Sequence, residues 1–413
     1  MKRAATICGS VSIVLALIVS RRPDALTNPQ FWAEDGRLWF AAAHNRGPLV
    51  ALLEPAAGYF QTFSRLTAAA GVAVGLRAAP LVFNVAAIVG QALPPLYLLS
   101  SRLAGAIPDW RLRALAALIL IGLPNSFEVQ SNVTNVQTHL AILGFLIVVA
   151  DAPRRRAWAA CDLLLLIVGG LSGPTYVFLV PVAIAVWWRE RSTWRLVVLA
   201  TVAATAVVQT VAFLTADGGG RFATPLEPTV RRFFGIVGGH IVVGGLAGAP
   251  VHGRLFLGQG DPGPLLPALG VVCVLAVARA FVVTSSFALR LLIVFGVLVL
   301  GAALTSPAVD AAPRWQALQW RDVGIRYWVI PTVAFLAVVL RSACADPWRG
   351  ARWVARVALA VLVLVGMPLD WRVKARPDLR FADQVERYED APPGSVVRIP
   401  IPPAGWEMRL RKR

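Results

Sequence analysis

Long runs of apolar residues recur along almost the whole chain, and they restrict the folds open to it more than any other feature. The first run follows a short basic start in "MKRAATICGSVSIVLALIVS" (1–20). A straight helix needs roughly 20 apolar residues to cross a bilayer, so the sequence predicts an all-α, polytopic transmembrane helical protein of about 11 spans. The ten further spans are expected near 80–100, 111–125, 134–150, 157–171, 174–188, 195–215, 264–283, 287–305, 326–343 and 353–369.

Two of these spans, 157–171 and 174–188, are shorter than a straight crossing needs. They meet at "GLSGPTY" (170–176). They form either one tight helical hairpin or an interrupted pair that borders a cavity.

Composition supports a membrane protein and excludes nucleic acid as a partner. Of 413 residues, 57% are hydrophobic and 15% are charged, whereas about a quarter of the residues are charged in soluble domains. The formal net charge of +18 comes from arginines scattered over many loops, not from one basic face or a nucleic-acid-binding motif. The four cysteines and four histidines show no disulfide or metal-ligand spacing, and we expect no metal and no cofactor.

Positive charge in the short loops predicts the orientation. Loops 151–158, 189–195 and 344–352 are basic and fall on one side of the membrane, together with Lys2 and Arg3. Short basic loops stay in the cytoplasm. The first run has no signal-peptide cleavage site after it, so we expect an uncleaved first helix, a cytoplasmic N-terminus and an extracytoplasmic C-terminus.

The extracytoplasmic side is expected to carry the long segments, and therefore any chemistry. Near 370 the chain becomes charged and rich in proline, which divides it into a transmembrane domain (1–369) and an extracytoplasmic C-terminal tail (370–413). Within the tail we expect a short helix at 378–390 and a short strand in "SVVRIPI" (395–401). The long outer segments of the domain are 21–79, 124–135, 216–263 and 306–325.

The first outer segment, 21–79, contains two stretches with apolar residues at helical spacing, 29–47 and 59–80. Both are expected to be amphipathic helices that lie in the membrane interface. Trp32 and Trp39 are then expected to anchor the first of them at headgroup depth.

An acidic pair, Glu34 and Asp35, sits in the first of these stretches. A partly desolvated carboxylate at the membrane surface is suited to accept a proton from a hydroxyl or an amine. The structural alternative is a pair that caps a helix or forms salt bridges with Arg37 or Arg21. An acidic pair at membrane depth is costly unless it is used or paired, which favours a functional role.

Several stretches together carry a resemblance to a known family. They are "FWAEDG" (31–36), "GYFQTFSRL" (58–66), "PNSFEVQSNVTNVQTHLA" (124–141), "GLSGPTY" and "RYWVIP" (326–331). With a long first outer loop and an acidic residue soon after the first span, they resemble the polyprenol-phosphate-dependent integral-membrane glycosyltransferases of the C-type glycosyltransferase fold, in an uncharacterised bacterial branch. The resemblance implies a location in the bacterial cytoplasmic membrane, a sugar donor linked to polyprenyl phosphate, and Asp35 as catalytic base, with Glu34 as second choice.

A lipid phosphate leaving group needs cationic or hydrogen-bond-donating partners. Arg326 and Tyr327 stand at the outer mouth of the span 326–343, and a guanidinium can bind two phosphate oxygens at once. Arginines at membrane boundaries also serve as snorkelling anchors, which is the alternative here. The further candidates for binding the phosphate are Arg231, Arg232, Arg314 and Arg321.

The segment 124–141 is unusually polar for a turn between two spans. Its side chains would suit a rim that binds sugar hydroxyls, because such hydrogen bonds decide which sugar fits. The alternative is a turn in which Asn125, Ser131 and Thr134 cap helix ends. The candidate sugar-binding residues are Glu128, Asn132, Asn135, Gln137 and His139.

The leading interpretation is transfer of a sugar from a polyprenyl-phosphate carrier to a cell-envelope glycan, lipid or protein acceptor on the extracytoplasmic face. Membrane lipids are the other partners expected. A transporter or flippase for lipid-linked sugars is the main alternative, but transporters place ionisable residues in the middle of their spans. Here the charges concentrate at the outer rim. A non-catalytic envelope-assembly subunit is the third possibility.

Overall fold

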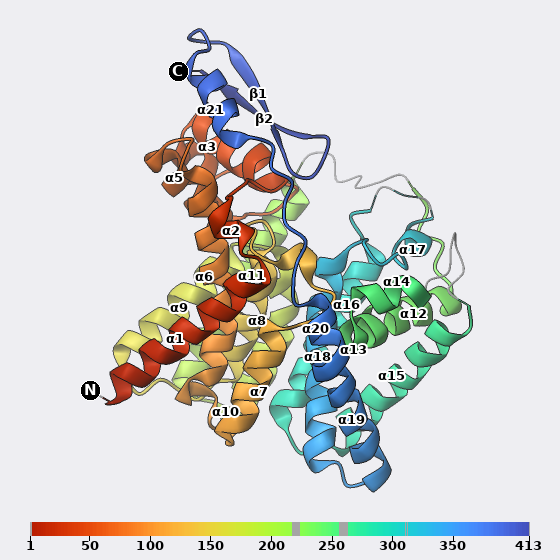
Figure 1. Cartoon of the computed structure of the whole chain (residues 1–413). Coiled ribbons are helices and arrows are strands. Elements are labelled where there is room, and N and C mark those ends of the chain that lie inside the picture. Colours follow the sequence, from red (N-terminus) through yellow and green to blue (C-terminus); the bar gives the residue numbers. More distant parts are fainter. Residues whose placement is uncertain (1, 217–223, 256–262, 310, 312, 413) are drawn as a thin grey trace.

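The computed structural model describes residues 2–216, 224–255, 263–309, 311 and 313–412, and these are mostly helical (Figure 1). Seven helices of this described part are long and apolar enough to cross a bilayer, which agrees with a polytopic membrane protein. Two shorter apolar helices, Cys8–Arg21 and Val136–Val149, accompany them. The seven are α6 (Ala79–Leu99), α11 (Thr193–Thr215), the helix Val230–Ala247, α15 (Leu265–Val283), α16 (Phe287–Thr305), α18 (Ile325–Ala345) and the helix Arg349–Asp370.

Further helices lie in the remaining apolar runs, and two short 3-10 turns, η2 (Ser101–Leu103) and η3 (Phe127–Val129), lie between runs. The two short runs meet at "GLSGPTY", where Gln209 Nε2 donates to Gly170 O and Gly173 O. The helices in these runs are α1 (Lys2–Arg21), α7 (Trp110–Ile121), α8 (Val136–Val149), α9 (Arg156–Gly170), η4 (Pro174–Leu179) and α10 (Val180–Glu190).

The stretch 216–263, expected as an outer segment, contains a membrane-length helix that the sequence analysis did not include among the spans. Its glycines are typical both of loops and of small-residue helix packing, and in the fold they serve close packing. A Cβ built on Gly238 would lie 1.8 Å from Leu266 O, and one on Gly270 would lie 2.0 Å from Phe234 O. Backbones can approach this closely where small residues face each other. The segments are α12 (Val230–Ile236), η5 (Val237–Gly244), α13 (Gly245–Ala247) and α14 (Ala249–Leu255).

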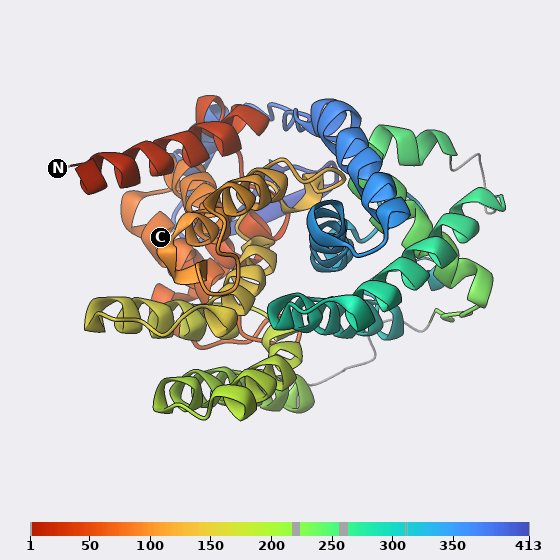
Figure 2. The same ribbon diagram turned by 90° about the horizontal axis from the view of Figure 1, so that it is seen from below.

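The helices fall into two groups along the sequence. Figure 2 shows the helices of residues 2–215 on one side and those of residues 230–370 on the other. α16 and α18 join the groups, because α18 packs against α8 and η3 while α16 packs against η4 and α10. The Arg349–Asp370 helix comprises α19 (Arg349–Val361), η6 (Leu362–Gly366) and α20 (Met367–Asp370).

The first outer segment and the C-terminal tail pack together at one end of the body (Figure 1). Both expected stretches, 29–47 and 59–80, contain helices, and the expected tail helix and strand are confirmed. A second strand was not expected, and the two form an antiparallel hairpin. The elements are α2 (Asp24–Thr27), η1 (Asp35–Phe40), α3 (Ala41–Arg46), α4 (Pro48–Leu52), α5 (Thr62–Val74), α21 (Phe381–Glu389), β1 (Val396–Ile401) and β2 (Trp406–Arg411). The outer segment 306–325 contains α17 (Arg314–Ala317), which contacts α12.

The hairpin buries its inner face on the first outer segment. Met408 and Leu410 of β2 are fully buried, and β2 contacts both η1 and α3. Asn45 pairs with the edge of β2, because its Nδ2 donates to Arg409 O at 2.9 Å and its Oδ1 accepts from Arg411 N at 2.9 Å. The tail therefore covers the first outer segment and is held to it by these contacts.

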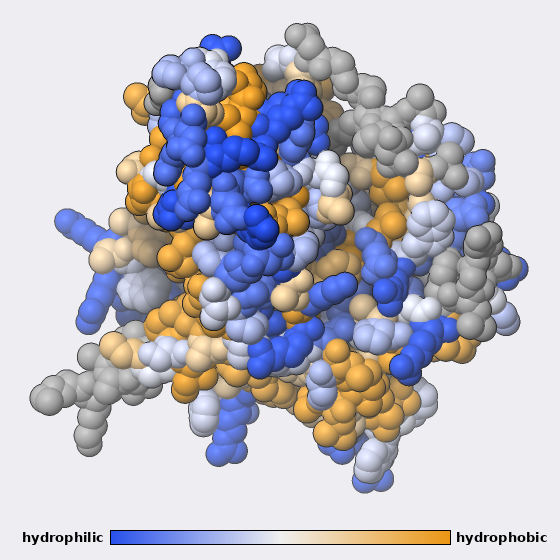
Figure 3. Space-filling view, turned by 45° about the horizontal axis from the view of Figure 1, so that its top comes forward, coloured by the Kyte–Doolittle hydropathy of each residue, from blue (hydrophilic) through white to orange (hydrophobic). Residues whose placement is uncertain are grey.

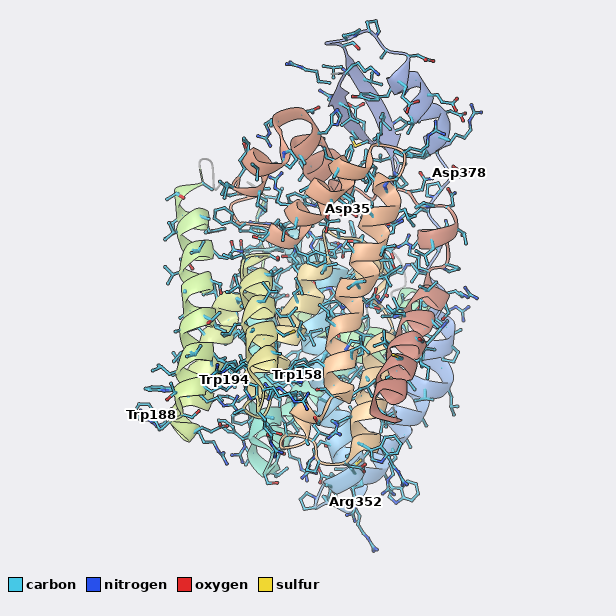
Figure 4. All side chains as sticks on the ribbon, turned by 90° about the vertical axis from the view of Figure 1, so that its left-hand side faces the viewer. Asp35, Trp158, Trp188, Trp194, Arg352 and Asp378 are labelled. Atoms are coloured by element: carbon cyan, nitrogen blue, oxygen red, sulfur yellow. The ribbon has the colours of Figure 1, made fainter. Side chains whose placement is uncertain are left out.

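The two ends of the helical body differ in character. Figure 4 shows Asp35 and Asp378 at one end, and Trp158, Trp188, Trp194 and Arg352, which lie in or next to the three basic loops, at the other. We call these ends the tail face and the basic-loop face. Figure 3 shows hydrophilic side chains gathered over the tail face and hydrophobic ones over much of the surface below it. The separation agrees with the predicted grouping of the loops.

Cysteine labelling should test which face lies outside the cytoplasm. In a background whose four cysteines are replaced by serine, Arg37→Cys and Asp378→Cys should react with a membrane-impermeant maleimide in intact spheroplasts, because both residues are exposed on the tail face. The exposed Arg154 and Arg349 stand in short basic segments that the positive-inside rule keeps in the cytoplasm. Arg154→Cys and Arg349→Cys should therefore react only after lysis. The reverse pattern would invert the orientation.

Candidate functional site

The turn before η1 directs Asp35 into the protein. Ala33 adopts φ +42°, and its N–H donates to Pro402 O of the tail at 2.6 Å. Gly36 follows at a close approach, because a Cβ built there would lie 3.0 Å from Ile401 Cδ1 and 3.1 Å from Phe31 Cβ. The "AEDG" stretch thus turns its second carboxylate away from solvent and under the hairpin.

The Asp35 carboxylate is 0% exposed and is bound by one short segment between η3 and α8. Oδ1 accepts hydrogen bonds from Thr134 N at 2.9 Å and from Thr134 Oγ1 at 2.8 Å. Oδ2 accepts a single bond, from Val133 N at 3.1 Å. Trp39 Nε1 donates to the same Thr134 hydroxyl at 2.9 Å, which fixes the direction of the hydroxyl proton toward Asp35.

Burial raises the pKa of Asp35 to about 6, against the opposing effects of Arg376 and of the hydrogen bonds from Thr134 and Val133. Since this pKa lies above the ordinary value of 3.8, the fold favours the protonated carboxyl. Asp35 therefore contributes stability at low pH that is lost as the pH rises through about 6. A carboxyl with this pKa changes its protonation state near neutral pH, as a general base must.

Arg376 of the tail is a buried cation whose charge acts on Asp35. Its Nη1 donates to Gln30 O at 2.6 Å and to Asn84 Oδ1 at 3.0 Å, and its Nη2 donates to Ser131 O at 2.7 Å. Burial lowers its pKa to about 9, with Arg22 adding to the effect and Asp35 opposing it. Arg376 thus ties the tail to the segment that holds Asp35.

Replacing Arg376 with leucine should lower the free energy of unfolding by roughly 3–5 kcal/mol, because buried acceptors lose a charged partner. The tail should also become sensitive to trypsin at its exposed arginines. Arg372→Leu, at an exposed position nearby, is the matched control and should change neither property. Wild-type stability and protease resistance in Arg376→Leu would contradict the proposed role of Arg376.

Glu34 has a different environment from Asp35. Its side chain is half-buried and has no hydrogen-bond or ion-pair partner among the described residues.

The neighbouring tryptophans correct one expectation. Trp39 is 2% exposed and packs in the core, so it is not a headgroup anchor. Trp32 is half-buried between Arg22 and Arg376, whose Cζ atoms lie 5.9 Å and 5.4 Å from its ring centroid.

Glu128, Arg326 and Tyr327 come together at the start of α18. The Glu128 carboxylate accepts from Arg326 N at 2.9 Å and forms an ion pair with Arg326 Nη1. The Arg326 side chain is still 34% exposed, and its Cζ lies 4.9 Å from the Tyr327 ring centroid. The guanidinium is therefore held in place by one carboxylate while part of it stays open to solvent.

The rest of the polar segment is mostly turned inward. Asn132 Nδ2 and Asn135 Nδ2 both donate to Glu128 O, at 2.6 Å and 2.9 Å, and His139 Nε2 lies 3.0 Å from Val129 O. Asn132, Asn135 and His139 are buried, and Gln137 is half-buried and donates weakly to Thr134 O. These inward contacts belong to an internally bonded turn, but neither η3 nor α8 has a side-chain cap, so Asn125, Ser131 and Thr134 do not cap these helices.

The other candidate arginines lie around α12, α14 and α17. Arg232 pairs with Glu227 at 3.1 Å, and Arg231 is exposed and also has a partner. Arg314 Nε donates to Thr224 O at 2.8 Å. Arg321 pairs with Asp322 at 3.1 Å. None of these contacts links the four side chains to Glu128 or Asp35.

Sequence reasoning missed the buried groups that complete this region. His240 and His252 are both buried, with ring centroids 4.6 Å apart, and His240 stacks on Trp328 at 4.9 Å. Asp370 Oδ2 accepts from Asn125 N at 2.6 Å and from Ala249 N at 2.8 Å. The tripeptide Arg-Pro-Asp occurs twice, in "RRPD" (21–24) and in "ARPD" (375–378). This repetition is the sequence feature that could have indicated Arg22 and Arg376.

Within the described residues, no three His, Cys, Asp or Glu side chains converge as a metal ion would require. The candidate site on the tail face consists of the buried Asp35 carboxylate, the half-buried Glu34 carboxylate and the Arg326 guanidinium, which Glu128 holds in place. Comparison of the sequence with protein-family models and with curated proteins gives no match.

Proposed function

We propose that this protein transfers a sugar from a polyprenyl-phosphate carrier to a cell-envelope glycan, lipid or protein acceptor at the tail face, which we propose lies outside the bacterial cytoplasmic membrane. The observation that carries the proposal is that one segment connects Asp35 to Arg326. Thr134 binds Asp35, and Glu128 binds Arg326. Six residue steps separate Glu128 from Thr134, so their Cα atoms lie at most about 20 Å apart.

These two groups suit the two halves of such a transfer. The acceptor oxygen or nitrogen forms a bond to the anomeric carbon of the sugar, and its proton passes to the carboxylate. The bond between that carbon and the phosphate oxygen breaks, and the lipid phosphate leaves with the electron pair. Arg326 would bind the phosphate, since a guanidinium stabilises charge that grows on phosphate oxygens.

A general base needs a suitable pKa and access to the acceptor, and each of the two carboxylates meets one of these requirements. Asp35 has the appropriate pKa, and its Oδ2 keeps room for a proton because it accepts a single hydrogen bond. It is fully buried, so an acceptor would reach it only if the hairpin or residues 131–134 move. Glu34 is accessible without such movement. We assign the base to Asp35 first and to Glu34 second.

A flippase for lipid-linked sugars is the competing function. It is favoured by the two groups of helices and by the cavity between them that is described in the next section. Transporters place ionisable residues in the middle of their spans, whereas Asp35 lies outside the first span. A non-catalytic assembly subunit would need neither the carboxylate nor Arg326.

The pH dependence of transfer tests the assignment. In proteoliposomes supplied with synthetic polyprenyl-phosphate hexoses and pentoses and with envelope fragments, release of free polyprenyl phosphate should fall as the pH drops through about 6, because the protonated carboxyl cannot accept a proton. Thr134→Val removes a hydrogen bond that lowers this pKa, so the midpoint should move up. A midpoint that Thr134→Val leaves unmoved would exclude Asp35 as the titrating base.

A further inference from the structure

The two groups of helices enclose a cavity of about 630 Å³ at the basic-loop face, on the far side of the body from Asp35. Its walls are mostly apolar side chains from α6, α7, α8, α16 and α18, among them Leu98, Ile142, Phe145 and Leu336. This volume lies within the range of about 300–1,000 Å³ that ligand pockets occupy. The candidate site on the tail face does not use it.

Charged side chains stand where this apolar cavity meets the basic-loop face. Arg189, Glu190 and Arg195 come from the end of α10 and the start of α11, and Arg341 comes from the end of α18. Glu190 is engaged by Arg195, whose Nε and Nη2 donate to it at 2.7 Å and 2.9 Å. Asp151 also lines the cavity, and its carboxylate accepts from Gly105 N at 2.9 Å.

Arg189 and Arg341 keep their charge available. Both are exposed, and neither has a carboxylate partner among the described residues. The Arg189 guanidinium lies 4.6 Å from the Phe287 ring centroid, at the first residue of the 19-residue helix α16. A helix N-terminus adds partial positive charge, so the rim carries an uncompensated positive potential.

We propose that this cavity binds a glycerophospholipid with an anionic headgroup, with an acyl chain between the two helix groups and the phosphate between Arg189 and Arg341. Apolar walls below two free guanidiniums match the two parts of such a lipid. Short basic loops mark the cytoplasmic face of membrane proteins, where the leaflet is rich in anionic lipids. The sugar donor is a different molecule, because its phosphate must stand at the opposite face to react near Asp35.

Lipid binding to the purified full-length protein tests this site. Native mass spectrometry after delipidation should show one phosphatidylglycerol bound in preference to phosphatidylcholine. Arg189→Gln/Arg341→Gln should weaken phosphatidylglycerol binding by roughly tenfold or more, since each arginine near an anionic headgroup contributes. The control, Arg154→Gln/Arg156→Gln, removes the same charge from exposed positions of the same face that do not line the cavity, and it should bind as the wild type does.

Two further measurements separate the cavity from general surface charge. Cys344 lines the cavity and is exposed, so phosphatidylglycerol should slow its modification by maleimide, mapped by peptide mass, while exposed Cys8 is unaffected. Ala337→Phe should narrow the cavity and weaken binding of the lipid. Equal binding of both lipids, equal loss in the arginine variant and its control, unchanged binding in Ala337→Phe, or displacement of phosphatidylglycerol by equimolar polyprenyl phosphate would each overturn the proposal.

Discussion

Asp35→Asn should reduce sugar transfer by roughly 10²- to 10⁴-fold, the loss typical of a missing general base. The structure adds a second effect that the assay must separate. The new amide can keep its oxygen toward Thr134, but its NH₂ group then faces Val133 N–H, which donated to Oδ2 at 3.1 Å. Two donors facing each other in a buried site should cost about 1–3 kcal/mol of stability.

Thr134→Val is the matched control for that second effect. It removes the hydroxyl that donates to Asp35 and accepts from Trp39, but it leaves the carboxylate in place. Transfer should be measured on both variants, together with thermal unfolding in detergent. If Asp35 only supports the fold, the two variants should lose transfer in proportion to stability. If Asp35 is the base, Asp35→Asn should lose far more. Inactive Glu34→Gln with active, folded Asp35→Asn would move the base to Glu34.

Arg326→Gln should reduce transfer by about 10²-fold or more, because a charged group that stabilises the leaving phosphate acts in the transition state. Loss of Arg326 also leaves the Glu128 carboxylate without its cation, which destabilises the fold by itself. A double-mutant cycle with Glu128→Gln separates the two contributions. Arg321→Gln, which breaks the exposed pair with Asp322, is the control and should retain transfer.

The cycle has opposite outcomes under the two roles. If Arg326 binds phosphate, Glu128→Gln should retain most of its transfer and the double variant should stay as inactive as Arg326→Gln. If Arg326 only neutralises Glu128, the double variant should recover both stability and transfer. That recovery would remove Arg326 from the proposed site.

The positions of most helices could be predicted because every backbone polar group in a bilayer must be bonded within its own segment. Apolar runs therefore report helices directly. The helix Val230–Ala247 was not counted as a span, because the glycines of "GIVGGHIVVGGLAG" (235–248) are typical both of loops and of close helix packing. Its glycines are explained by contacts with α15, as Gly238 meets Leu266 O, and nothing local in the sequence announces that neighbour.

The second tail strand was missed for a different reason. β2 has the period-two pattern of a half-buried strand, with Met408 and Leu410 buried and Arg409 and Arg411 exposed. Its many charges at the chain end are typical of a solvated tail. Burial against η1 and α3 makes it a strand, and that partner lies hundreds of residues away in the sequence.

The acidic pair itself was found in the sequence, but its surroundings could not be. Thr134, which binds Asp35, is 99 residues away, and Arg376 belongs to the tail. The contrast between a fully buried Asp35 and a half-buried Glu34 depends on the turn at Ala33 and on the hairpin above it. The polar segment 124–141 was read in two ways, and its inward hydrogen bonds depend on the same long-range contacts.

The most direct test of sugar transfer by this protein is the profile of lipid-linked sugars and envelope glycans in a deletion strain. The strain is complemented with the wild type or with Asp35→Asn. If the protein transfers a sugar, the deletion strain should accumulate one polyprenyl-phosphate-linked sugar at the outer face. The same sugar should be missing from one envelope glycan, lipid or protein. The wild type should restore both pools and Asp35→Asn neither. Accumulation of the donor at the cytoplasmic face would indicate a flippase instead, and unchanged pools in the deletion strain would contradict sugar transfer altogether.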